Sequence, residues 1–62
     1  MLLSQWLETH GVSRRELARR SGTSLATVQD ALKGRHITLR SACLISNATG
    51  KAVTLEDLAN AL

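Results

Sequence analysis

Basic side chains are concentrated in the middle of this chain of 62 residues. Seven of the eight lysines and arginines lie between positions 14 and 40, where only Glu16 and Asp30 oppose them, so this stretch carries a net charge of +5. The rest of the chain has one positive and three negative side chains, a net charge of −2. Clustered cations bind phosphate groups, which predicts a polyanion such as nucleic acid as the partner. The alternative is that the same cations only keep a small domain in solution.

Other reactive side chains are few and isolated. Cys43 is the single cysteine, so no disulfide can form within the chain, and His10 and His36 have no second ligand nearby for a structural zinc ion. The sequence has no glycine-rich phosphate loop, cysteine pair or nucleophile motif, and it predicts no enzyme, metal or cofactor. Its longest apolar run covers only residues 42–45, and no secretory signal opens it. We therefore expect a cytoplasmic protein without a membrane or small-molecule partner.

Apolar residues at helical spacing predict five short helices in a single domain that covers residues 1–62. The predicted helices cover residues 2–10, 13–20, 25–33 and 39–49, with a short fifth helix from residue 55 onward. Ser13 with Glu16, and Thr54 with Asp57, have the spacing of capping boxes. Trp6 is the only aromatic residue, and we interpret both it and Cys43 as parts of the core.

Residues 13–34 have the pattern of two helices that meet at a steep angle across a short turn. Ala18 allows the two backbones to approach, Gly22 gives the turn its freedom, and Val28 fills the angle between the helices. The pattern of Leu-Ala at 17–18, Gly22, Val28 and Ala-Leu-Lys-Gly at 31–34 is similar to the helix-turn-helix of the Cro and lambda-repressor-like family.

This resemblance covers nearly the whole chain, because a helix precedes the motif and residues 38–58 are similar to the fourth and fifth helices of that family. It implies a compact, all-α, five-helix lambda-repressor-like domain that binds double-stranded DNA. The implied protein is a transcriptional regulator, most simply a Cro-like repressor, at the nucleoid of a bacterium or in a phage-infected cell. Residues 25–28 also resemble the lactose-repressor motif, but that type opens its chain without a helix like the one at 2–10.

The resemblance implies that the helix at residues 25–33 enters the major groove. The family's base-contacting positions fall on Leu25, Ala26, Gln29 and Asp30. Gln29 can pair with adenine, and Leu25 or Ala26 can contact a thymine methyl group. Asp30 can accept a hydrogen bond from a cytosine amino group, or it can repel phosphates and orient a neighbouring arginine.

Phosphate contacts need donors at helix starts or long cations on the same face. The candidates are Arg14, Ser24, Thr27, Lys33, Arg35, Thr38 and Arg40. Helical spacing cannot place Arg15, Arg19 and Arg20 all on the DNA side, so we expect at least one of these three to be solvated.

One domain buries too little surface for useful specificity, so we expect a homodimer on a pseudo-palindromic operator with half-sites about 34 Å apart. The predicted dimer surface is the last apolar stripe, formed by Leu55, Leu58, Ala59 and Leu62. The same stripe can instead complete the core of the monomer.

A rival hypothesis is a protein-binding adaptor or an antitoxin-like module with weak or no DNA binding. Leu25, Ala26 and Asp30 favour it, because they are unusually apolar or acidic for a groove-reading face. The clustered cations favour DNA.

Overall fold

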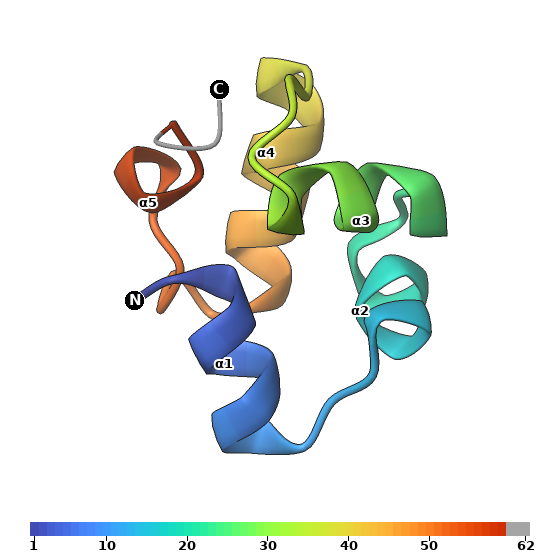
Figure 1. The fold of residues 1–62 in the computed structure, drawn as a ribbon, viewed down its shortest axis with the longest axis vertical. Coiled ribbons are helices and arrows are strands. Elements are labelled where there is room, and N and C mark those ends of the chain that lie inside the picture. Colours follow the sequence, from blue (N-terminus) through green and yellow to red (C-terminus); the bar gives the residue numbers. More distant parts are fainter. Residues whose placement is uncertain (60–62) are drawn as a thin grey trace.

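The computed structural model describes residues 1–59, and this part of the chain forms five helices (Figure 1). The helices are α1 (Leu3–His10), α2 (Arg14–Ser21), α3 (Leu25–Leu32), α4 (Leu39–Ala48) and α5 (Leu55–Ala59). The predicted all-α, five-helix architecture is thereby confirmed. None of the helices among residues 1–59 is long and apolar enough to cross a membrane.

Helix ends lie within two residues of their predicted positions, because local capping chemistry sets them. Ser13 Oγ accepts a hydrogen bond from the Glu16 amide at 3.1 Å, which begins α2. Gly22 has a left-handed backbone with φ of 75° and ends α2, and its amide donates to the Ala18 carbonyl at 3.0 Å. Glycine adopts this conformation without steric cost, so the chain can turn directly into α3.

One of the two predicted capping boxes is complete and the other is not. The Thr54 hydroxyl accepts the Asp57 amide at 3.1 Å, and the Asp57 carboxylate accepts the Thr54 amide at 3.0 Å, so the box that begins α5 is confirmed. The other predicted box is wrong in its second bond, from the Ser13 backbone N–H to the Glu16 carboxylate. This bond is not made because the Glu16 carboxylate binds Arg19 and Arg20 instead. Two cations one turn along the helix attract a carboxylate more strongly than a neutral backbone N–H does.

The core lies where α4 passes between the α2–α3 pair and α5 (Figure 1). Its largest fully buried side chains come from α2, α3, α4, the α4–α5 loop and α5, in that order: Leu17, Val28, Ile45, Val53 and Leu58. Each of these five segments thus gives one of these large side chains to a single core, to which α1 adds Leu3, Trp6 and Leu7. Burial of this apolar surface is the main force that holds such short helices together.

Trp6 lies in the core as predicted, with 5% of its surface exposed. His10, one turn further along α1, is exposed. Its ring stacks on Trp6 with centroids 4.6 Å apart, and its Nδ1 atom lies 3.0 Å from the Trp6 carbonyl oxygen. A polar ring at the last residue of a helix can cover an indole while its edge stays in water.

Cys43 is only half-buried, so its predicted place in the core is wrong. The inward face of α4 carries Ala42, Ile45 and Ser46, all of them buried. Cys43 is turned away from that face by one helical step and lies at the edge of a groove between α4 and α5.

Candidate nucleic-acid interface

The turn between α2 and α3 is held by hydrogen bonds that converge on one carbonyl group. The Ala18 oxygen accepts the amides of Gly22 and Thr23 at 3.0 and 3.1 Å, and the buried Ser21 hydroxyl at 3.2 Å. Ser21 Oγ also lies 2.7 Å from Thr23 Oγ1. Sequence reasoning missed that Ser21 and Thr23 hold this turn, although hydroxyl residues on both sides of a turn glycine are a usable signal. The network fixes the direction in which α3 leaves the turn.

Helix α3 divides into a buried face and an outward face. Val28 and Ala31 are buried and anchor the helix on the core. The four residues predicted to contact bases all lie in α3 outside the core, with Ala26 exposed and the other three, Leu25, Gln29 and Asp30, half-buried. The rigid turn and the buried face together present this outward set at a fixed orientation.

Hydroxyl groups predicted to contact phosphates already cap helices. Ser24 Oγ accepts the Thr27 amide at 3.1 Å and lies 2.9 Å from the Thr27 hydroxyl, at the start of α3. Thr38 Oγ1 accepts the Ser41 amide at 3.1 Å and donates to Ser41 Oγ at 3.0 Å, at the start of α4. Sequence reasoning missed Ser41, whose signal is a Thr followed by a Ser three residues later.

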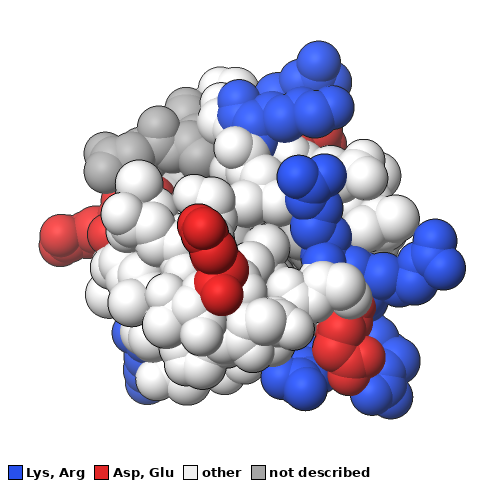
Figure 2. Space-filling view, turned by 60° about the horizontal axis from the view of Figure 1, so that its bottom comes forward, with Lys and Arg blue, Asp and Glu red and all other residues white. Residues whose placement is uncertain are grey.

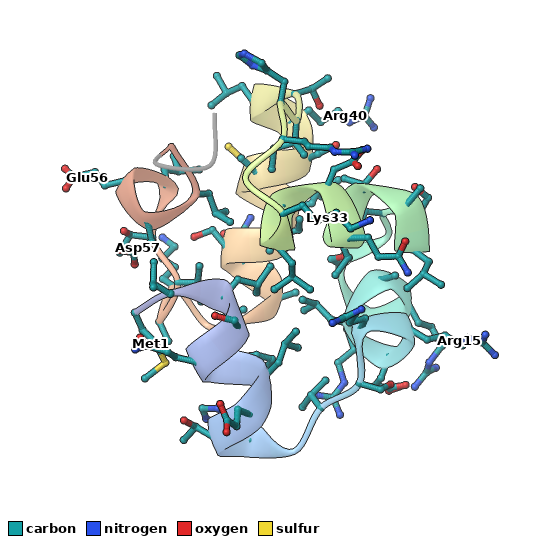
Figure 3. All side chains as sticks on the ribbon, in the orientation of Figure 1. Met1, Arg15, Lys33, Arg40, Glu56 and Asp57 are labelled. Carbon is teal, nitrogen blue, oxygen red and sulfur yellow. The ribbon has the colours of Figure 1, made fainter. Side chains whose placement is uncertain are left out.

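Most Lys and Arg side chains gather on the side of the molecule where α2, α3 and the start of α4 lie, while Glu56 and Asp57 lie on the opposite side with α5 (Figures 2 and 3). Lys33 extends from the end of α3, and Arg40 from the start of α4 (Figure 3). The cations predicted to contact phosphates are all exposed: Arg14, Lys33, Arg35 and Arg40. The charge asymmetry seen along the sequence is therefore also an asymmetry in space.

Glu16 holds two of the three remaining arginines of α2. Its Oε1 atom lies 2.6 Å from Arg19 Nη2 and 3.2 Å from Arg20 Nε. The hydrogen bond from Arg19 is the main cause that lowers the pKa of the Glu16 carboxyl, and the same contact raises the pKa of Arg19. The Arg15 side chain instead extends away from α2 into solvent (Figure 3).

The predicted dimer stripe is split by the fold. Leu58 is 2% exposed and belongs to the monomer core, whereas Leu55 is 42% exposed and lines the groove between α4 and α5. Ala59 is the last residue of α5, and Leu62 lies outside the described residues. The alternative that the stripe completes the monomer core therefore holds for Leu58.

The start of α5 is tied to the chain's first residue. The Met1 amino group lies 2.7 Å from Asp57 Oδ2, and it is the main cause that lowers the pKa of the Asp57 carboxyl from 3.8 to about 2, with the Thr54 amide adding to it. Among residues 1–59, no group of three or more His, Cys, Asp or Glu side chains is placed to hold a metal ion.

Comparison with known proteins identifies the architecture. A family model described as helix-turn-helix matches residues 3–58, which run from the first residue of α1 into α5. Comparisons with curated proteins and with solved structures each find no match.

Proposed function

Because the chain belongs to the Cro and lambda-repressor-like family of DNA-binding helix-turn-helix regulators, we propose that it is a sequence-specific repressor that reads the major groove with α3. The observation that carries this proposal is the division of α3. Val28 and Ala31 lock one face into the core, while Leu25, Ala26 and Gln29 are left for base edges. Gln29 pairs with adenine, and the two apolar side chains contact thymine methyl groups.

The DNA backbone is held by groups that border α3. Arg14 at the start of α2, Lys33 after α3 and Arg40 at the start of α4 are exposed cations on three neighbouring elements. Ser24, Thr27 and Thr38 add hydroxyls at helix starts, where backbone N–H groups also favour phosphate. The location that fits this role is the cytoplasm, at the nucleoid.

Two copies bind one operator in this proposal. A single copy of α3 reaches too few base pairs to distinguish one site in a genome, so a dimer on a pseudo-palindrome is required. The exposed Leu55 beside the α4–α5 groove supports this end of the molecule as the contact between copies.

The test of DNA recognition is selection from a randomised pool of short duplexes at moderate salt. We expect an inverted repeat with half-sites about ten base pairs apart. Arg14→Ala should lower the slope of log affinity against log salt by about 1, because one phosphate contact is lost. Lys51→Asn is the matched control: it removes a cation outside the basic stretch, from a residue with a φ of 65° that asparagine tolerates, and it should leave the slope unchanged.

Recovery of DNA without a motif would contradict sequence-specific binding. No recovery even at low salt would favour the protein-binding adaptor, whose apolar contacts would respond little to salt.

The test of the dimer is sedimentation of the free protein over a range of concentrations. Leu55→Lys should shift the protein towards monomer without loss of helix content, because Leu55 is 42% exposed. The matched control is Leu39→Lys, since Leu39 is 68% exposed at the start of α4 and outside the groove. Equal dimerisation by the wild type and Leu55→Lys would place the interface elsewhere.

A further inference from the structure

The turn that ends α3 places Asp30 and Arg35 side by side. The Arg35 amide donates to the Asp30 carbonyl oxygen at 2.9 Å, and the Gly34 amide to the Ala31 carbonyl oxygen at 3.4 Å, around a Gly34 φ of 75°. This is the hydrogen-bond pattern of a Schellman motif, in which the first and last residues usually make an apolar contact. Here the two residues carry opposite charges, so the backbone of the turn brings an ion pair together.

The side chains of this pair meet at the edge of the predicted reading face. Arg35 Nη1 lies 4.0 Å from Asp30 Oδ1, and the side chains are 69% and 40% exposed. A guanidinium has five N–H donors in a planar fork, and the contact with Asp30 involves one end of it. The remaining N–H donors of Arg35 can therefore bind a second acceptor while the contact with Asp30 holds the guanidinium in its orientation.

We propose that Arg35 reads a guanine through its O6 and N7 atoms, and that Asp30 is the positioning residue that directs Arg35 there. The inference rests on the proposed function, since it assigns the base that one edge of α3 recognises. It replaces the phosphate contact predicted for Arg35 from the sequence, and it selects for Asp30 the role of orienting an arginine.

Charge explains why a base is the better partner than a phosphate. The Asp30–Arg35 pair is neutral as a whole, so its attraction to a phosphate is largely cancelled, and the Asp30 carboxylate repels the phosphate oxygens. The edge of guanine is uncharged and offers two acceptors spaced for an arginine fork. Lys33, Arg14 and Arg40 have no ion pair among the described residues, and they remain the phosphate-binding cations.

The experiment measures affinity for the selected operator and for every single-base variant of one half-site. The proteins are the wild type, Arg35→Ala, Asp30→Ala, the double variant and a control, Glu8→Gln, which removes an exposed acid on α1. Circular dichroism verifies that each is folded.

We expect Arg35→Ala to bind the operator roughly 5- to 150-fold more weakly and to lose its preference for G·C at one position, with an unchanged salt slope. Asp30→Ala should lose part of the same preference and none at other positions. In the Arg35→Ala background, Asp30→Ala should have no further effect on base preference.

Several results would overturn the inference while leaving the proposed function intact. Arg35→Ala could weaken binding to all sequences alike and lower the salt slope by about 1, which identifies a phosphate contact. Asp30→Ala and Glu8→Gln could strengthen binding to every sequence equally, which reduces Asp30 to a net-charge effect. A further loss of preference on adding Asp30→Ala to Arg35→Ala would show that Asp30 touches a base itself. If the wild type selects no motif, the proposed function and this inference fail together.

Discussion

Val28→Ala tests whether the core holds α3 in place. Val28 is fully buried, on the face of α3 opposite the outward residues. The substitution removes two buried carbon atoms, worth about 0.8 kcal/mol each, and the cavity left behind adds up to about 1 kcal/mol. We expect the free energy of unfolding to fall by about 1.6–2.6 kcal/mol. A chain of this length has roughly 3–9 kcal/mol in total, so this loss is about a fifth of the stability or more.

The assay is urea unfolding followed by circular dichroism and by the fluorescence of Trp6. Trp6 is the only aromatic residue in the sequence and is buried in the same core, so both signals should report one transition. The midpoint should fall without a change in slope, and Tm should fall by about 10–20 °C. Val12→Ala is the matched control, because Val12 is only partly buried at the edge of the core, and it should cost less than half as much.

Two results would refute this reasoning. A loss below about 0.5 kcal/mol for Val28→Ala, typical of surface changes, would mean that α3 is not anchored by this side chain. An equal loss for Val12→Ala would mean that burial does not set the cost.

Val28→Thr keeps the shape but buries a hydroxyl, and it should also destabilise the domain.

Three further perturbations have defined outcomes. Gly22→Ala should destabilise the domain by about 1–2 kcal/mol in urea unfolding, because the φ of Gly22 is 75°, although an added Cβ meets nothing within 4 Å. Gly22→Asn should cost less than Gly22→Ala, and a loss above about 2 kcal/mol for Gly22→Ala would indicate a steric clash. Asp57→Asn should be less stable than the wild type at neutral pH, and this difference should disappear as the pH falls from 3.8 towards about 2, because the Asp57 carboxyl stabilises the fold only while it is ionised. A difference in stability that persists below pH 2 would contradict this prediction. Glu16→Gln should leave Tm nearly unchanged and strengthen binding to random DNA at low salt, because it releases Arg19 and Arg20 from their ion pairs. Unchanged DNA binding would show that neither arginine reaches DNA.

The helices were predictable because their ends depend on neighbouring residues. Gly22 ends α2, and Thr54 with Asp57 begins α5, through bonds that span three or four positions. Competition between partners was harder to predict, since Glu16 can serve either its cap or two arginines and only the side-chain geometry decides. The burial of Leu58 was open for another reason: a stripe of leucines has the same spacing whether it faces the core or a second copy.

The candidate site was predictable in the same uneven way. The outward residues of α3 follow from helical periodicity, because buried Val28 leaves its neighbours facing out. The partner of Asp30 could not be named, since Arg35 lies outside the helix and reaches Asp30 only through the left-handed turn at Gly34. A residue five positions away is brought back to a helix by that turn and not by helical spacing.

The separation of α3 into two faces has an evolutionary consequence. Residues that fold the domain, such as Val28 and Ala31, are buried, whereas Ala26 on the same helix is exposed. Substitutions at surface positions usually change stability by less than about 0.5 kcal/mol. Copies of the gene can therefore diverge towards new operators at Ala26 while the domain keeps its stability, and a designer can randomise the same position in a library.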